Sequence, residues 1–97
     1  MGEAWSVSIR YTRRALRQLA EILDHIEAES PQGAENVKRR LYAVVQLLAD
    51  HPNVGRVTNK GNIRRIVVRP YPYLIFYRPE PVGIVSHGIR HAARRPL

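Results

Sequence analysis

Residues 63–78 read IRRIVVRPYPYLIFYR, and this run decides the fold. In its first half Ile66 and Val68 alternate with Arg65, Val67 and Arg69, which is the two-residue period of a strand with one apolar face. Pro70-Tyr71-Pro72 is typical of a turn. In the second half Tyr73, Ile75 and Tyr77 alternate with Leu74, Phe76 and Arg78. We therefore expect two neighbouring strands, over 63–69 and 73–78.

Two further strands are expected, one on each side of this pair in the sequence. Pro79-Glu80-Pro81 should end the strand over 73–78, and residues 82–89 then supply another strand. Near the N-terminus Trp5, Val7 and Ile9 alternate with Ser6, Ser8 and Arg10, which indicates a half-buried strand.

The segment between the first strand and residue 52 has the period of two helices. Thr12 can cap a helix whose apolar positions are Ala15, Leu19, Ile22 and Ile26. Ser30-Pro31 is a second start signal, a capping serine followed by proline at the first helical position. This second helix should end before Pro52 and bury Ala34, Val37, Leu41, Val44 and Leu48. Because so short a turn joins them, the two helices should form an antiparallel hairpin.

The order β-α-α-β-β-β predicts an α+β fold in one domain over residues 1–97. We expect a small antiparallel sheet with the N-terminal helical hairpin packed on one face. The opposite face should be open and carry much of the arginine.

Charge is sorted along the chain. Residues 1–50 carry seven basic and seven acidic residues, whereas residues 51–97 carry nine basic residues and one acidic residue, Glu80. The second half therefore holds the whole net charge of +8. Such sorting predicts a positive surface for a polyanion or an acidic partner. Arginine makes up most of the basic residues and favours planar, bidentate contacts to phosphate or carboxylate.

Composition excludes several kinds of site. The chain has no cysteine, which excludes disulfides and thiolate metal sites and makes a reducing cytoplasm the plain expectation. No apolar run is long enough to cross a bilayer, and no secretory signal is present. We expect no cofactor. We also expect no metal site, because His87 and His91 have no carboxylate near them in the sequence.

Several features together resemble RelE/ParE-type toxins. They are Ser30-Pro31 with Ala34, then Leu48, His51-Pro52 and Gly55-Arg56, then Arg64 or Arg65, the stretch 71–78 and the terminal His91-Ala92-Ala93-Arg94. The resemblance covers nearly the whole chain in order. It implies the toxin of a bacterial type II toxin–antitoxin module, with a small antitoxin that binds and silences it. That partner should be acidic and partly disordered, should fold on binding, and should give a toxin–antitoxin hetero-oligomer.

The resemblance implies two targets. RelE-like members cut messenger RNA on the ribosome, whereas ParE-like members poison DNA gyrase and need no nuclease residues. The long helical hairpin and the terminal His-Ala-Ala-Arg are closer to ParE-like and plasmid-stabilisation members. This half of the chain has one lysine, Lys60, and no terminal tyrosine, which departs from the RelE-like pattern. Growth inhibition through gyrase is the first expectation, an mRNA endoribonuclease the second, and a nontoxic nucleic-acid-binding module the third.

Candidate site residues follow from these alternatives. If the chain is RelE-like, Arg65, His91 and Arg94 should surround the phosphate, with His91 kept neutral by neighbouring arginines. A histidine that only ties the last strand to the sheet is the alternative for His91. Candidate contacts to a partner or phosphate are Arg64, Arg69, Lys60, Tyr71 and Arg90.

Strand alternation limits which candidates can act together. Arg64 and Arg65 must point to opposite faces, and the pattern leaves open which of them binds a partner. Arg65 shares its face with Arg69. His87 shares a face with His91 only if no bulge intervenes at Gly88. Tyr77 should belong to the core.

Overall fold

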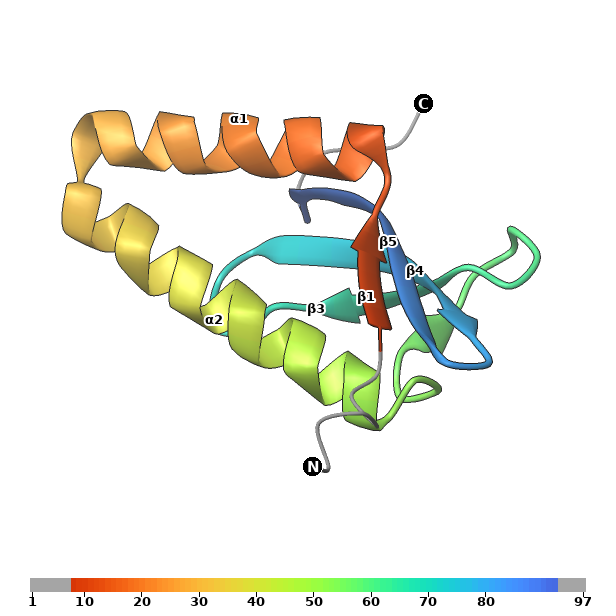
Figure 1. Ribbon diagram of the computed structural model, residues 1–97. Coiled ribbons are helices and arrows are strands. Elements are labelled where there is room, and N and C mark those ends of the chain that lie inside the picture. The colour runs from red at the N-terminus through yellow and green to blue at the C-terminus, as the bar shows by residue number, and fades with distance from the viewer. Residues whose placement is uncertain (1–7, 93–97) are drawn as a thin grey trace.

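The computed structural model describes residues 8–92 and confirms the α+β order that the sequence predicts (Figure 1). Its elements are β1 Ser8–Tyr11, α1 Arg13–Glu29, α2 Pro31–Asp50, β2 Arg56–Val57, β3 Arg64–Val67, β4 Tyr73–Glu80 and β5 Gly83–His91. The short strand β2 was not expected. Trp5, Val7, Arg94 and Arg95 lie outside the described residues. No helix within 8–92 has the length and apolar character needed to cross a bilayer.

The sheet is mixed rather than wholly antiparallel. Its strand order is β1-β5-β4-β3-β2, and β1 runs parallel to β5 while the other neighbours are antiparallel. Parallel neighbours need a long connection, and here the whole helical hairpin and three strands separate β1 from β5. The long connection therefore allows the parallel pairing of β1 with β5, which a short hairpin could not form.

β4 is longer than predicted, because Pro79 and Glu80 belong to it and pair with Ile84 and Gly83. The expectation that Pro79 ends the strand is wrong for a physical reason. Alternate residues of β4 direct their amide and carbonyl groups toward the side of β3. Tyr73, Tyr77 and Pro79 are among these residues. β3 begins at Arg64, opposite Tyr77, so Pro79 has no strand beside it to which an N–H could donate.

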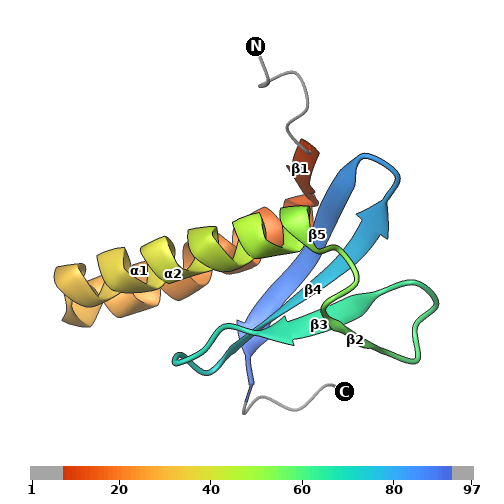
Figure 2. The same ribbon diagram turned by 90° about the horizontal axis from the view of Figure 1, so that it is seen from below.

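Both helices begin where the sequence predicts. The Thr12 hydroxyl oxygen accepts a hydrogen bond from the Ala15 amide at 3.0 Å, and that of Ser30 accepts one from the Gly33 amide at 2.9 Å. Each cap pairs one of the amides that the first turn of a helix leaves free. Pro31 occupies the first turn of α2, where its missing N–H costs nothing. The hairpin so formed covers one face of the sheet (Figures 1 and 2).

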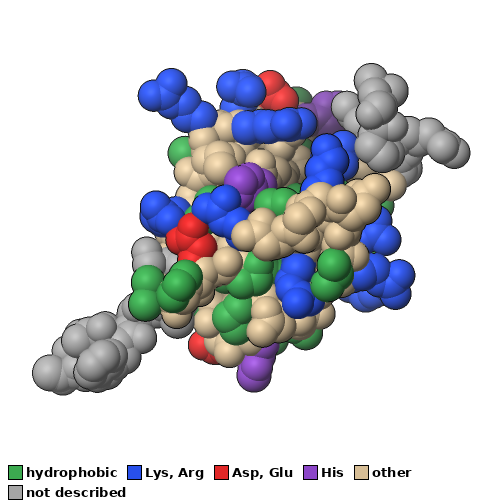
Figure 3. Space-filling model, turned by 90° about the vertical axis from the view of Figure 1, so that its right-hand side faces the viewer, with side chains coloured by type: hydrophobic (Ala, Val, Ile, Leu, Met, Phe, Trp, Pro, Cys, Tyr) green, Lys and Arg blue, Asp and Glu red, His purple; other side chains and the backbone are tan. Residues whose placement is uncertain are grey.

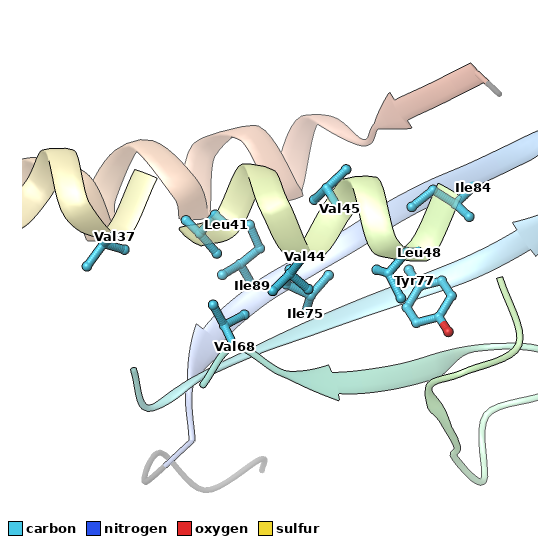
Figure 4. Packing of buried hydrophobic residues seen from close by; sticks show 10 residues of the cluster. All are labelled: Val37, Leu41, Val44, Val45, Leu48, Val68, Ile75, Tyr77, Ile84 and Ile89. Carbon is cyan, nitrogen blue, oxygen red and sulfur yellow. The ribbon is translucent and has the colours of Figure 1, made fainter. Parts of the chain in front are cut away.

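The core lies between α2 and the sheet (Figure 4). α2 contributes all five residues that its pattern predicts to be buried, together with Val45. All of these except Ala34 pack on Val68, Ile75, Tyr77, Ile84 and Ile89, which the sheet turns toward the helices. Ile75 and Tyr77 are fully buried, as their alternation with Leu74, Phe76 and Arg78 predicts.

Tyr77 also fixes the turn that follows α2. Its hydroxyl donates to the Pro52 carbonyl at 2.7 Å and accepts from the Gly55 amide at 2.9 Å. A Cβ on residue 55 would lie 2.5 Å from that hydroxyl oxygen, so only glycine fits beside it. The turn therefore fixes the position of β2 at the edge of the sheet.

Candidate functional site

The face of the sheet opposite the helices carries a run of basic side chains. Pairing places Arg56 beside Arg65, Arg65 beside Phe76, and Arg90 beside Leu74, all on this open face. Arg10 and Arg78 extend the same face toward the other edge, where both pair with Val85. Figure 3 views the molecule from the right-hand side of Figure 1 and shows many Lys and Arg side chains with few acidic ones among them. The sheet face that carries these arginines, called the open face below, is the candidate site.

Arg64 and Arg65 have different surroundings. Arg64 is partly buried, and its guanidinium donates to the Gly55 carbonyl at 2.8 Å and the Asn53 carbonyl at 3.1 Å. It therefore holds the turn after α2 against β3. Arg65 is exposed and lies on the open face. Of this neighbouring pair, only Arg65 is exposed on the open face.

Glu80 joins two strands of the open face. Its carboxylate accepts from Arg78 at 2.6 Å through one oxygen and from Arg10 through the other. These hydrogen bonds, that from Arg78 first, lower the pKa of Glu80. Val85 lies between the two arginines and is buried on a face that no helix covers. The ion pairs thus neutralise part of the basic run at the β1 edge.

Phe76 and Arg90 form a stacked pair in the middle of the open face. The Arg90 guanidinium carbon lies 4.7 Å from the centroid of the Phe76 ring. This distance is that of a cation–π contact, which holds the guanidinium over the ring. Arg90 is therefore preorganised on the open face.

One of the two histidines of β5, His87, lies in a bulge. Phe76 pairs with Gly88 but Tyr77 pairs with Ser86, so His87 is the extra residue. The pKa of His87 is lowered by burial first and by the charge of Arg78 second, and Glu80 offsets part of that. His87 thus lies near the Arg78–Glu80 pair, and its Nε2 is buried without a hydrogen-bond partner in the described part of the chain.

His91 lies on the opposite side of the sheet from Arg65. It pairs with Tyr73, and the two rings meet edge to face with their centroids 5.5 Å apart. Tyr73 shares the helix-facing side with Ile75, whereas Arg65 pairs with Phe76 on the open face. The structure therefore does not bring Arg65 and His91 together, and Arg94 lies outside the described residues.

The other candidates lie at the rim. Arg69 is exposed, and its carbonyl accepts from the Arg40 side chain of α2. Lys60 is exposed in the loop 58–63 between β2 and β3. Tyr71 is partly buried and packs against the core. Of these, Arg69 continues the open face past the end of β3.

An open groove of about 430 Å³ lies where β3 continues past Arg56, the first residue of β2. Arg56, Arg65 and Arg69 line it together with Val54, Val67 and Leu74. No acidic residue is among its lining residues. Among residues 8–92 no group of three or more His, Asp or Glu is arranged to hold a metal ion.

The sequence did not single out Arg10, Phe76, Arg78 or Glu80 as members of the site. Their partners are distant in the chain, since Arg10 and Glu80 are 70 residues apart. The charge of Glu80 was visible, as the one acidic residue of the second half, but its pairing depends on the parallel placement of β1.

Comparison with known proteins gives consistent matches. A family model described as the ParE toxin of type II toxin–antitoxin system, parDE, matches residues 9–96. Putative toxin Y4kP of Sinorhizobium fredii is 41% identical over 70 residues, which cover 72% of this chain and 73% of that protein. Toxin RelE2 of Caulobacter vibrioides is 38% identical over 84 residues, covering 87% of this chain and 93% of that protein.

The fold also matches a solved structure. It is described as the chromosomal ParDE TA system from P. aeruginosa, and it aligns with a TM-score of 0.75 at 21% identity. The alignment covers 89% of this chain and 96% of that chain. At this identity the likeness shows the fold, with its helical hairpin and sheet.

Proposed function

Because this chain belongs to the ParE toxin family of type II toxin–antitoxin systems, we propose that it stops growth by binding DNA gyrase. Inhibition by binding needs a shaped surface and no acid–base pair. The helical hairpin and the open face provide such surfaces on opposite sides of the molecule.

The observation that carries the proposal is the separation of Arg65 from His91. Cutting RNA requires a base for the 2′-hydroxyl, an acid for the leaving oxygen and cations at the phosphate, all within reach of one another. Arg65 lies on the open face, whereas His91 packs against Tyr73 on the other side. His87 is on the side of Arg78, but its Nε2 is buried rather than exposed to a substrate. This arrangement favours binding over cleavage.

The antitoxin is expected to cover the open face. Its basic run combines Arg56, Arg65 and Arg90 with few acidic groups, and arginines favour carboxylates. An acidic segment that folds on binding would neutralise this charge and bury the apolar side chains between the arginines.

Two assays on the purified chain test the target. In the first, gyrase supercoils a relaxed plasmid with ATP; in the second, a message on stalled ribosomes is probed for cleavage by primer extension. We expect inhibition of supercoiling and an intact message, with gyrase activity restored by the antitoxin. Normal supercoiling together with a cleaved message would reverse the assignment.

A RelE-like endoribonuclease is the second candidate, favoured by the stacked Arg90–Phe76 pair and by exposed Arg65 on one face. Aromatic and arginine planes on an open sheet suit single-stranded RNA. Arg65→Ala and His91→Ala should then abolish toxicity in cells. Full toxicity in both variants excludes this second function.

A further inference from the structure

Glu80 is the one acidic residue in the strands that the structure describes. Its side chain lies on the open face, because Phe76, Arg78 and Glu80 alternate along β4 and Phe76 is on that face. The side chain is 24% exposed, so neighbouring groups cover most of it. The negative charge of the sheet is therefore placed among the arginines.

A row of three residues crosses the sheet beside Glu80. Arg10 of β1 and Arg78 of β4 both pair with Val85 of β5, so the three side chains lie side by side on the open face. Val85 is buried although no helix covers this face. Such burial is expected where the aliphatic stems of two flanking arginines lie over an apolar side chain.

Glu80 binds both of these arginines at once. One carboxylate oxygen accepts from Arg78 at 2.6 Å, and the other accepts from Arg10. The residue opposite Glu80 on β5 is Gly83, which has no side chain to block the way across that strand toward Arg10. The same hydrogen bonds lower the pKa of Glu80, so its carboxylate is charged at neutral pH. Glu80 is thus an internal counter-ion for two strands.

The two guanidinium groups would otherwise suit a phosphate. Arginines that hold the two oxygens of one carboxylate can hold two oxygens of a phosphate in the same way. A basic face attracts nucleic acid of any sequence, because phosphate contacts supply the nonspecific affinity. Since Glu80 already occupies Arg10 and Arg78, a phosphate must displace the carboxylate before it can bind them.

We propose that Glu80 is a specificity determinant that keeps the phosphates of duplex DNA from binding Arg10 and Arg78. Genomic DNA offers a basic protein a very large number of competing nonspecific sites. Glu80 fills one anion site from within the chain and leaves the attraction to the exposed arginines elsewhere on the open face. The protein is then held less by DNA and is left available to protein partners. This role goes beyond the target proposed above, because it concerns a ligand that the chain excludes.

The test measures binding of the full chain to a short fluorescent DNA duplex by anisotropy over a range of salt concentrations. Glu80→Gln keeps the shape of the side chain and removes its charge. Glu35→Gln is the matched control, because Glu35 also pairs with a cation, Lys38 at 3.8 Å, but lies on α2. Both substitutions raise the net charge equally.

We expect Glu80→Gln to tighten duplex binding about three- to tenfold at moderate salt. The slope of log affinity against log salt should steepen by about one to two, since each added phosphate contact contributes about 0.9. Glu35→Gln should change both quantities much less. Equal effects of the two substitutions would mean that net charge alone draws the duplex, which overturns the role of Glu80. Unchanged binding by a Glu80→Gln protein that is folded by circular dichroism overturns it as well.

Charge-neutral double variants locate the effect. Glu80→Gln combined with Arg78→Gln has the net charge of the wild type but lacks one of the two guanidinium groups. We expect its duplex affinity to return close to the wild-type value, and the same for Glu80→Gln combined with Arg10→Gln. A double variant that binds as tightly as Glu80→Gln would show that the added phosphate contact lies elsewhere, which contradicts the proposal.

Nuclear magnetic resonance of the wild-type chain gives a readout that does not depend on any variant. The side-chain Nε–H signals of Arg56 and Arg65 should shift when the duplex is added, whereas those of Arg10 and Arg78 should stay in place. A shift at Arg78 as large as that at Arg65 overturns the proposal. Neither gyrase nor an antitoxin is present in these assays, so an error in the proposed target leaves their outcome unchanged.

Discussion

At the scale of single residues, the hydroxyl of Tyr77 is a polar group of the core that two hydrogen bonds hold in place. It lies inside a fully buried side chain, yet both of its hydrogen-bonding partners come from the turn after α2. Burial raises the pKa of Tyr77, against the lowering effects of the Gly55 amide and the charge of Arg64. The neutral phenol is therefore the form that joins helix, turn and sheet.

Tyr77→Phe should destabilise the protein by about 1–3 kcal/mol, because it leaves the Gly55 amide and Pro52 carbonyl without their partner in a buried place. Urea unfolding followed by circular dichroism measures the change. Tyr42→Phe is the control, since Tyr42 is 67% exposed on α2 and should change stability by less than about 0.5 kcal/mol. Equal stability of the two variants would contradict the role given to the Tyr77 hydroxyl.

His87 and Glu80 make stability depend on pH in the same direction. The folded state lowers the pKa of His87, so the unfolded chain binds the proton more readily, and stability falls as pH drops through 6.5. Glu80 also has a lowered pKa in the folded state, and its contribution is present above its ordinary pKa of 4.5 and lost below it. Acid therefore lowers the stability of the folded protein in two pH ranges, and His87 accounts for the higher range.

His87→Gln should remove most of the fall in melting temperature between about pH 7 and pH 5, because glutamine takes up no proton there. Thermal unfolding at a series of pH values measures this slope. His25→Gln, on the exposed side of α1, should keep the wild-type slope. A His87→Gln protein that loses stability with acid as steeply as the wild type would show that another group titrates.

At the scale of elements, α1 completes the edge of the sheet where β1 stops. β1 pairs with β5 up to Ser86, and beyond it the Thr12 hydroxyl donates to the His87 carbonyl at 3.3 Å. Gln18 then accepts from the Ile89 amide at 2.9 Å. A Cβ on Gly88 would lie 2.9 Å from the same Gln18 oxygen, so glycine makes room for the side chain. Side chains from the start of α1 thus make hydrogen bonds to β5 where β1 no longer pairs with it.

Gln18→Ala should cost about 1–3 kcal/mol of stability, because the Ile89 amide loses its acceptor at a partly buried edge. Gln18→Glu keeps an oxygen in the same place and should lose much less. Denaturant unfolding compares the three proteins, and the amide exchange of Ile89 should rise in the alanine variant alone. Ile89 exchange that stays slow with alanine would mean that Gln18 is dispensable.

Elements that depend on local periodicity were predictable, and those that depend on distant partners were not. Thr12, Ser30 and Pro31 marked both helix starts, and alternation over 63–78 identified the buried face of the central strands. The parallel pairing of β1 with β5 could not be predicted, because no local pattern records which edge a strand joins. The extension through Pro79 depends on β3 beginning at Arg64, which is likewise a property of the neighbour.

At the scale of the whole molecule, the helical hairpin covers one face of the sheet, and arginines occupy the other face. The sequence predicted this open face from the charge of residues 51–97, and Arg65 lies on it. It did not predict that His91 would point the other way, because a bulge at His87 changes the alternation. Nor did it predict that Arg10 comes from the neutral half to share Glu80 with Arg78. The face is therefore built from both halves of the chain.

A basic face of this kind should speed association with an acidic antitoxin, and the effect should depend on where the charge lies. Arg56→Gln and Arg39→Gln lower the net charge equally, but Arg56 lies on the open face and Arg39 is exposed on α2. We expect Arg56→Gln to slow association roughly two- to fivefold at low salt, and Arg39→Gln to change it much less, because steering depends on the local field. Stopped-flow fluorescence over a range of salt concentrations measures both rates. The difference should shrink as salt screens the face. Equal slowing by the two substitutions would show that net charge, not the open face, steers the antitoxin.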